Sequence, residues 1–315
     1  MFDKIHFWLI ILSMKNLCEI CPRNCKIDRN IQKGFCGEKS LIRVAKTMLH
    51  FFEEPMISGT QNGFQNARGS GAIFFSGCPL KCVYCQNFNI SHDGIGKTIS
   101  TQDLADIFKT LEEKGATNIN LVTPTHYTTQ IIEALKIYKP KIPIVWNTSG
   151  YEKPETIKKL AGFVDIFLTD LKYVSSELSM KYSGAKDYFE FASKSILEMK
   201  KIAPNDVIEN GIMRSGLIVR HLALPGQTED SLKVIDWIKE NLGTNTIVSM
   251  MSQYVPMGNV KKYTKKYLEI NRKLTKLEYK ILVNKLENIG FKNALIQDLE
   301  SADESFTPNF LADSN

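Results

Sequence analysis

The chain has 315 residues, of which 43% are hydrophobic and 23% charged, as in an ordinary soluble globular protein. This length suffices for one large α/β domain and a small additional module. The net charge of +6 is mild, and the basic residues are scattered apart from a denser run at 261–266, so these totals argue against a nucleic-acid partner.

All seven cysteines lie in the first 85 residues. An odd number excludes a complete disulfide framework, so we interpret the thiols as metal ligands. Clustered thiolate ligands in a chain of this size are typical of a reducing compartment, and the sequence therefore predicts a cytoplasmic protein. The seven are Cys18, Cys21, Cys25, Cys36, Cys78, Cys82 and Cys85.

An apolar run at the N-terminus, residues 5–12, is too short for a membrane span, which needs about 20 residues. No small-residue cleavage site follows it, so a secretory signal is also disfavoured. Two readings stay open. Either translation starts at Met14 and residues 1–13 are a doubtful extension, or these residues form a short helix or strand.

The rest of the chain divides into three segments by composition. Residues 14–57 are polar and rich in turn residues, and a metal bound by their four cysteines would replace the missing apolar core. Residues 58–260 open with a bridge rich in Gly, Asn and Gln and form the expected core. Residues 261–315 form a tail, with an amphipathic helix at 272–289 and a short strand at 291–297.

Apolar strands and amphipathic helices alternate through the core. Strands separated by helices indicate parallel βαβ units. Six such strands predict a partial (β/α)6 barrel of the α/β class, with a doubly wound open sheet as the alternative. The predicted strands are 72–76, 118–123, 142–148, 164–171, 216–224 and 246–254, and the predicted helices are 101–115, 128–138, 153–162, 187–202 and 228–243.

Polar or reactive side chains follow every predicted strand. In a parallel barrel the carboxyl ends of the strands meet at one rim, where active sites form. We therefore expect these side chains to compose an active-site rim. The candidates are Cys78, Cys82 and Cys85, then Thr123, Thr125 and His126, then Asn147 and Ser149, then Asp170 and Lys172, then Arg220 and His221, and last Gln253 and Tyr254.

The three cysteines after the first strand have the spacing C-x3-C-x2-C. A cubane iron–sulfur cluster normally takes four thiolates, so three would leave one iron open for another ligand. The alternative is a structural zinc loop that borrows its fourth ligand from elsewhere in the chain.

This motif, with Tyr84 before its last cysteine and Gln-Asn after it, resembles the radical S-adenosylmethionine (SAM) superfamily. The resemblance implies a catalytic 4Fe–4S cluster on Cys78, Cys82 and Cys85, whose open iron binds the amino and carboxylate groups of SAM. It also implies reductive cleavage of SAM to a 5′-deoxyadenosyl radical, which abstracts hydrogen from a substrate while the barrel orients the reactants and excludes water.

A narrower resemblance covers residues 67–255. "DLK" at 170–172 and "IVRHLALPG" at 218–226 are similar to the activating enzymes of glycyl-radical enzymes, and the front cysteines and "EEPMISG" are typical of a subgroup labelled pyruvate formate-lyase-activating-enzyme-like. The resemblance implies an oxidoreductase that acts on a glycyl residue of a partner enzyme. It also implies that Asp170 and Lys172 lie at the SAM site.

One position departs from the pattern of the activating enzymes. They show Gly-Gly-Glu after the second strand, where the motif seats the amino group of SAM, whereas this chain reads "TPTH". We expect the hydroxyls of Thr123 and Thr125 and the imidazole of His126 to take the acceptor role.

Three further side chains are expected to contact SAM. Arg220 would grip the SAM carboxylate with two hydrogen bonds, and Asn147 and Ser149 would bond the ribose hydroxyls. His126 and His221 each have a structural alternative, in which hydrogen bonds hold the imidazole in the protein interior.

The front cysteines, with the spacing C-x2-C-x3-C-x10-C, supply four thiolates, which close a metal site. Two occupants stay open, structural zinc and an electron-relay iron–sulfur cluster. We favour the cluster because a radical SAM enzyme must deliver an electron to its buried catalytic cluster. The basic residues between these cysteines would suit a flavodoxin- or ferredoxin-like donor, and a zinc knuckle that docks a protein substrate is the alternative.

Three functions therefore stay open. The first is the activation of a glycyl-radical enzyme. The second keeps the radical chemistry but acts on a peptide, a nucleic acid base or a cofactor precursor. The third is a non-catalytic zinc protein that binds nucleic acid or protein through residues 18–36, against which the predicted active-site rim argues.

Overall fold

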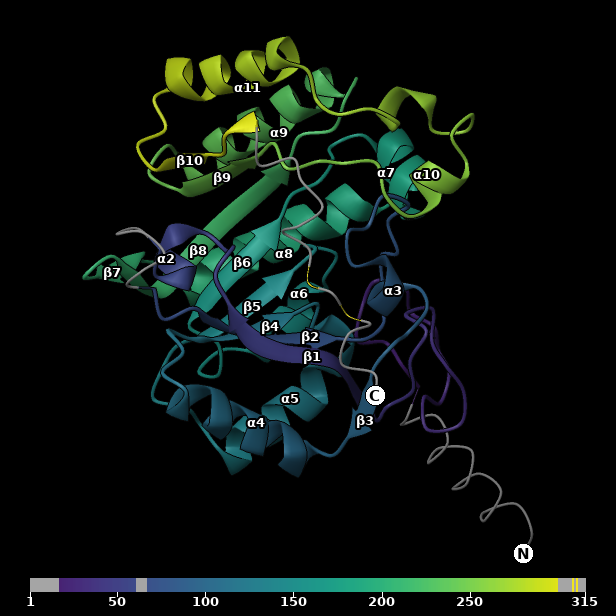
Figure 1. Cartoon of the computed structure of the whole chain (residues 1–315), viewed down its shortest axis with the longest axis vertical. Coiled ribbons are helices and arrows are strands. Elements are labelled where there is room, and N and C mark those ends of the chain that lie inside the picture. The colour runs from purple at the N-terminus through teal and green to yellow at the C-terminus, as the bar shows by residue number, and fades with distance from the viewer. Residues whose placement is uncertain (1–16, 61–66, 300–307, 309, 311–315) are drawn as a thin grey trace, which may run out of the picture.

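The computed structural model describes residues 17–60, 67–299, 308 and 310. Its centre is one curved sheet with the strand order β10-β9-β8-β6-β5-β4-β2-β1-β3, and β7 pairs with β8 outside this path (Figure 1). The strands are β1 (Ile42–His50), β2 (Ser70–Phe75), β3 (Lys97–Ile99), β4 (Ile119–Val122), β5 (Ile144–Thr148), β6 (Ile166–Asp170), β7 (Val207–Glu209), β8 (Ile212–Leu222), β9 (Ile247–Met251) and β10 (Ala294–Ile296).

The six predicted core strands are present as β2, β4, β5, β6, β8 and β9, and neighbours among them pair in parallel. The predicted tail strand is β10, which adds a further parallel strand beside β9. The α/β class and the partial barrel are thus confirmed. The predicted extension at 1–13 lies outside the described residues.

The helices that follow the core strands pack on one face of the sheet. Outward-facing Ile73 and Phe75 of β2 share a buried cluster with Leu104 and Phe108, whereas inward-facing Phe74 belongs to another cluster. This arrangement is that of a barrel rather than of a doubly wound sheet. The helices are α2 (Pro55–Ser58), α3 (Phe88–Ser91), α4 (Thr101–Glu113), α5 (Thr128–Ile137), α6 (Pro154–Lys158), α7 (Ser176–Ser183), α8 (Tyr188–Ile202), α9 (Thr228–Leu242), α10 (Asn259–Lys262) and α11 (Lys276–Ile289), with 3-10 turns η2 (Thr125–Tyr127) and η3 (Leu268–Ile270).

Strand β1 is the main difference from the expected organisation. Its residues were assigned to the cysteine module, which was expected to extend to residue 57, but they pair antiparallel with β2 and extend the main sheet. The strand was missed because Lys46 and Thr47 interrupt its apolar pattern, and its pairing with β2 shifts register between Val44 and Lys46. The turn after β1 therefore enters the barrel rather than the cysteine module.

The interior of the barrel is closed at the amino ends of its strands. Ile57 of α2 is fully buried in a cluster with the inward-facing residues Val145, Leu168 and Ile218. This apolar plug leaves the polar side chains of the interior at the other end, where the strands finish.

Candidate active site

A cavity of about 400 Å³ lies at the carboxyl ends of the core strands. Most of the side chains predicted for the rim meet there. These are Cys78, Cys82, Cys85, Thr123, Asn147, Ser149, Asp170, Lys172, Arg220 and Gln253. The segment after β1 contributes Phe51, Phe52 and Glu53.

The loop after β2 presents its three thiols to this cavity. Each sulfur accepts a hydrogen bond from a neighbouring group. The donors are the hydroxyl of Ser183 to Cys82 (3.0 Å), the hydroxyl of Ser91 to Cys85 (3.3 Å) and the backbone N–H of Leu80 to Cys78 (3.4 Å). Burial raises the pKa of Cys85 to about 12 and raises those of the other two thiols, so all three stay protonated unless a bound cation stabilises the thiolates.

This donor set fits a 4Fe–4S cluster. Each thiolate of a cubane binds a different iron, so the thiols must share a cavity but need not converge on one ion. Within the described residues no three Cys, His, Asp or Glu side chains converge on a single metal ion. The hydrogen bonds to the three sulfurs would stabilise the negative charge of a bound cluster.

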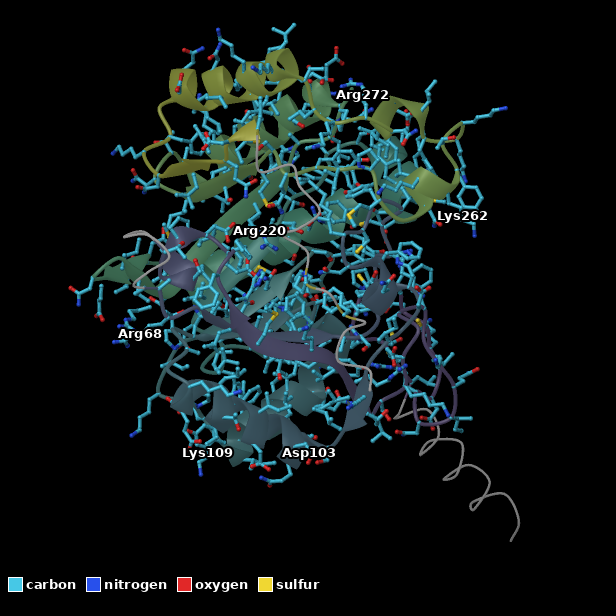
Figure 2. All side chains as sticks on the ribbon, viewed as in Figure 1. Arg68, Asp103, Lys109, Arg220, Lys262 and Arg272 are labelled. Carbon is cyan, nitrogen blue, oxygen red and sulfur yellow. The ribbon has the colours of Figure 1, made fainter. Side chains whose placement is uncertain are left out.

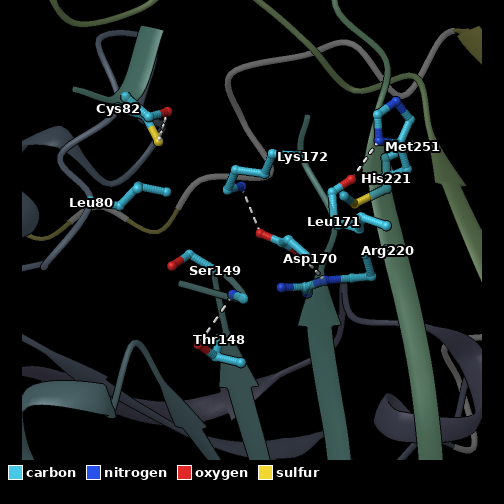
Figure 3. A network of polar contacts seen from close by, with 12 residues as sticks. Leu80, Cys82, Thr148, Ser149, Asp170, Leu171, Lys172, Arg220, His221 and Met251 are labelled. Atoms are coloured by element: carbon cyan, nitrogen blue, oxygen red, sulfur yellow. Dashed lines mark hydrogen bonds and ion pairs between the residues drawn. The ribbon is translucent and has the colours of Figure 1, made fainter. Parts of the chain in front are cut away.

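A charged network lines the same cavity, and Figure 3 shows it together with Cys82. Lys172 Nζ lies 2.6 Å from Asp170 Oδ2, and Arg220 Nε lies 2.8 Å from Asp170 Oδ1. Arg220 Nη2 donates to Asn147 Oδ1 at 2.6 Å, and its side chain, which is 14% exposed, lies near the middle of the view in Figure 2. Burial by itself would raise the pKa of Asp170, but Arg220 and Lys172 together hold it below its usual value.

Glu53 completes this network and was not among the predicted site residues. Its Oε1 accepts hydrogen bonds from Asn120 Nδ2 (3.0 Å) and Asn147 Nδ2 (3.2 Å), and its Oε2 lies 3.4 Å from Arg220 Nη1. Burial raises the pKa of Glu53, and Arg220 opposes that shift. The motif "EEPMISG" contains this residue, but a reading by strand ends could not find it because it follows the antiparallel strand β1.

The turn after β4 separates the predicted "TPTH" residues. Thr123 lines the cavity with a left-handed backbone (φ 58°), which is uncommon for a β-branched residue. The next turn, η2, is buried and directs Thr125 and His126 away from the cavity. Among these residues, the structure therefore brings only Thr123 to the cavity.

Thr125 instead supports a buried carboxyl group that the sequence analysis missed. Glu152 is fully buried, and its Oε1 accepts hydrogen bonds from Thr125, Trp146 and Thr148 at 2.7, 3.1 and 2.7 Å. Thr148, at the end of β5, also lines the cavity. Glu152 lies outside the cavity and holds the end of β5 through its hydrogen bond with Thr148. Nothing in the sequence distinguishes Glu152 from an exposed helix-start glutamate.

His126 and His221 both take their structural alternatives. His126 Nε2 bonds the carbonyl of Ser76 at 2.7 Å, and burial, with the nearby Arg29 charge, lowers its pKa to about 3. His221 bonds the carbonyl of Leu171 at 2.7 Å (Figure 3) and the hydroxyl of Ser231 at 2.8 Å. Both rings therefore hold neighbouring segments in place.

Tyr254 is a core residue and lines no part of the cavity. Its hydroxyl donates to the carbonyl of Ile270 at 2.7 Å, and its side chain is 1% exposed. Gln253, by contrast, lines the cavity and accepts a hydrogen bond from Gln297 Nε2 at 3.2 Å.

The four front cysteines lie near one another, but no three of them converge on a single metal ion within the described residues. A methyl group placed at Gly34 would lie 3.4 Å from Cys36 Sγ and 3.6 Å from Cys25 Sγ, so both sulfurs face this glycine. Burial, with smaller contributions from the charges of the other three thiolates, raises the pKa of Cys21 to about 12. A metal would remove this penalty, since it binds the deprotonated thiolate.

The front cysteines are attached directly to the loop that carries Cys78, Cys82 and Cys85. The N–H of Cys78 donates to the carbonyl of Cys36 at 3.1 Å. Arg23 Nε donates to the carbonyl of Pro79 at 2.7 Å, and its Nη1 donates to that of Gly184 at 2.6 Å. These bonds hold the front cysteines, the cysteine loop and the end of α7 in one arrangement.

Within the described residues, no helix combines the length and the apolarity that crossing a bilayer requires.

A family model described as the radical SAM superfamily matches residues 72–247. A curated protein of Methanocaldococcus jannaschii, described as uncharacterized protein MJ0674, is 31% identical over 268 residues, which make up 82% of this chain and 70% of that protein.

Among solved structures, SuiB of Streptococcus suis bound to the precursor peptide SuiA aligns with a TM-score of 0.48 and 18% identity over 71% of this chain and 48% of SuiB. SuiB bound to S-adenosylmethionine aligns with a TM-score of 0.48 and 15% identity over 71% of this chain and 49% of SuiB. This chain thus spans about half the length of the SuiB structures.

Proposed function

Because this chain belongs to the radical SAM superfamily, we propose that it is an activase-like oxidoreductase that takes a hydrogen atom from a glycyl residue of a partner enzyme. When bound, a 4Fe–4S cluster and SAM supply the chemistry of the family, reductive cleavage of SAM to a 5′-deoxyadenosyl radical. The residues of this chain would bind and orient these groups and exclude water.

One observation carries the proposal. Three buried thiols, each with a hydrogen-bond donor, line the same cavity as the network of Asp170, Lys172 and Arg220. Thiolates for a cluster and charged groups for an amino acid moiety are the two features that a SAM site must combine. A structural zinc loop would need no such network.

Each residue of the network has a role in this proposal. Lys172 and Arg220 would attract the carboxylate of SAM, and Asp170 would accept from its ammonium group. Glu53 would replace the glutamate of the absent Gly-Gly-Glu motif, because it brings a carboxylate to the same cavity from a different strand. Thr123, Asn147 and Ser149 would meet the ribose, while Thr125 and His126 would act from outside the cavity.

The front cysteines would hold a second iron–sulfur cluster that relays electrons. The hydrogen bond from Cys78 N–H to the carbonyl of Cys36 supports this role, because it joins the two sites without an intervening side chain. The donor would be a flavodoxin- or ferredoxin-like protein, drawn to basic residues of the module such as Lys26 and Lys33.

Reductive cleavage of SAM tests the proposal. Protein reconstituted anaerobically with iron and sulfide should form 5′-deoxyadenosine from SAM in the presence of a strong reductant. A Cys78→Ala/Cys82→Ala/Cys85→Ala variant should form none, and the matched variant Cys18→Ala/Cys21→Ala/Cys25→Ala should retain cleavage with a chemical reductant. No cleavage by the wild type would refute the proposal.

The glycyl target needs its own test. A candidate partner enzyme that carries deuterium on its glycine α-carbons should transfer the label into 5′-deoxyadenosine. Deoxyadenosine that forms with this partner but carries no label would exclude the glycyl residue and favour a different substrate.

A further inference from the structure

The sulfur of Cys82 lies at the end of a chain of three hydroxyl groups. Ser183 Oγ lies 3.0 Å from Cys82 Sγ, Tyr173 Oη lies 3.0 Å from Ser183 Oγ, and Tyr84 Oη lies 2.5 Å from Tyr173 Oη. The residues that carry these hydroxyls are 5% exposed or less. We call Ser183, Tyr173 and Tyr84 the hydroxyl chain.

The direction of the three hydrogen bonds follows from their protons, because each hydroxyl has one proton to donate. A thiolate can only accept, so Ser183 donates to Cys82. Tyr173 must then donate to Ser183, and Tyr84 to Tyr173. Burial raises the pKa of both phenols well above the usual value, so both keep their protons. All three O–H dipoles therefore point along the chain towards the sulfur.

The other two thiols of the loop have weaker donors. The Ser91 hydroxyl lies 3.3 Å from Cys85 Sγ but only 2.8 Å from His92 Nδ1, so its proton is not committed to the sulfur. Cys78 accepts from the backbone N–H of Leu80 at 3.4 Å. Both contacts are longer than that from Ser183, and neither donor is held by a further hydroxyl within the described residues.

The backbone holds Ser183 beside the cysteine loop. The N–H of Val83 donates to the carbonyl of Tyr182 at 2.8 Å, and Arg23 Nη1 donates to that of Gly184 at 2.6 Å. Ser183 is the last residue of α7, where a serine hydroxyl can bond a carbonyl of the preceding turn. Here it donates to a sulfur of a different segment, and the backbone bonds on both sides maintain this arrangement.

Hydrogen bonds to the thiolate ligands of an iron–sulfur cluster raise its reduction potential, because the reduced cluster carries one more negative charge. A donor that itself accepts hydrogen bonds is polarised and therefore stronger, above all in a buried site. The hydroxyl chain combines both features at one of the three cluster ligands.

We propose that Ser183, with Tyr173 and Tyr84 behind it, is a positioning residue that raises the reduction potential of the cluster on the cysteine loop. This inference rests on the proposed function, because it requires a cluster on these thiols. The reduction adds one electron to the cluster, supplied by the flavodoxin- or ferredoxin-like donor, and moves no proton. The raised potential makes the cluster easier for such a donor to reduce.

Redox titration of the full-length reconstituted protein without SAM tests the inference. Titanium(III) citrate sets the potential of the solution, and electron paramagnetic resonance measures the reduced cluster, whose signal is the one that Cys78→Ala/Cys82→Ala/Cys85→Ala lacks. At a fixed potential, Ser183→Ala should lower the ratio of reduced to oxidised cluster about tenfold, as the loss of one hydrogen bond to a charged group implies. This factor corresponds to about 59 mV for one electron.

Tyr173→Phe keeps the aromatic ring and Ser183 but removes the hydroxyls behind it from the chain. It should lower the same ratio about threefold, because the polarisation from two hydrogen bonds is lost. Tyr254→Phe is the matched control, since Tyr254 is also buried and contacts the ring of Tyr84 while its hydroxyl donates to the carbonyl of Ile270. This variant should leave the ratio unchanged.

An unchanged ratio in Ser183→Ala, at the iron content of the wild type, would overturn the inference. So would equal ratios in Tyr173→Phe and Tyr254→Phe, because the hydroxyl chain would then have no effect of its own. If Ser183→Ala fails to bind iron, the comparison of the two tyrosine variants still decides. The proposed function fails separately, through a wild type whose cluster is reduced but does not cleave SAM.

Discussion

Asp170 links the two cations of the cavity, because its two oxygens lie 2.6 and 2.8 Å from Lys172 and Arg220. Asp170→Asn leaves both cations without this partner in a largely buried site. We expect the free energy of unfolding to fall by about 3 kcal/mol at neutral pH, measured by urea titration.

The control for Asp170→Asn is an exposed ion pair. Glu190→Gln removes the pair with Lys194, whose side chains are 61% and 60% exposed, and should change the free energy of unfolding by less than about 0.5 kcal/mol. Equal losses in the two variants would contradict the structural role of Asp170.

His126 should make stability depend on pH. In the unfolded chain its imidazole takes up a proton below the ordinary pKa of 6.5, whereas burial and the Arg29 charge delay protonation in the folded chain to about pH 3. Stability contributed by the neutral imidazole is therefore lost as pH falls from 6.5 towards 3.

His126→Gln removes this titration. Between pH 7.5 and 5 the wild type should lose about 2 kcal/mol more than the variant, measured by urea titration at each pH. The same pH dependence in both proteins would show that His126 is protonated while folded.

At the scale of elements, the cysteine loop depends on close packing against the front module. Gly77 has a left-handed backbone (φ 81°), and a methyl group there would lie 2.5 Å from Glu38 Cγ and 2.7 Å from the carbonyl oxygen of Cys36. Gly77→Ala should lower the free energy of unfolding by about 3 kcal/mol and reduce the iron bound per chain.

Gly115 offers the matched comparison for this change. It has nearly the same φ (80°) but no atom within 4 Å of the added methyl group. Gly115→Ala should therefore show only the backbone strain, about 1 kcal/mol, with unchanged iron content. If Gly77→Ala behaves like Gly115→Ala, the front module does not position the cysteine loop.

The helices and core strands, which have a clear apolar pattern, could be predicted from the sequence, whereas strand β1 could not. The buried core strands are short runs of apolar residues between helices, so their number and parallel pairing followed from the pattern. Strand β1 has mixed polar residues and a register shift, and its partner lies across the bridge to β2. Pairing of this kind depends on tertiary contacts that no local pattern carries.

The residues of the candidate site, too, could be predicted only where the local sequence pattern determines their position. Side chains directly at strand ends, such as Asn147 and Asp170, reach the cavity because parallel strands finish together. Thr125 and His126 lie only a few residues further, but the turn η2 rotates them towards the core. Glu53 was missed for the opposite reason, because a strand outside the alternating core brings it into the interior.

At the scale of the whole molecule, we propose that one chain holds two iron–sulfur sites, which the cysteine loop joins. The front cysteines and the catalytic cysteines lie in different segments, and the carbonyl of Cys36 and the N–H of Cys78 bring them together. Loss of the three catalytic thiols should therefore empty one site and leave the other loaded.

Iron and sulfide analysis with an anaerobic visible spectrum tests this claim most directly, on the wild type and on Cys78→Ala/Cys82→Ala/Cys85→Ala. We expect about eight irons per chain in the wild type and about four in the variant, as two cubane clusters require. About four irons in the wild type and none in the variant, with one zinc in both, would mean that the three cysteines hold a cluster and that the front cysteines hold structural zinc. No iron in either protein would contradict the presence of an iron–sulfur site in this chain.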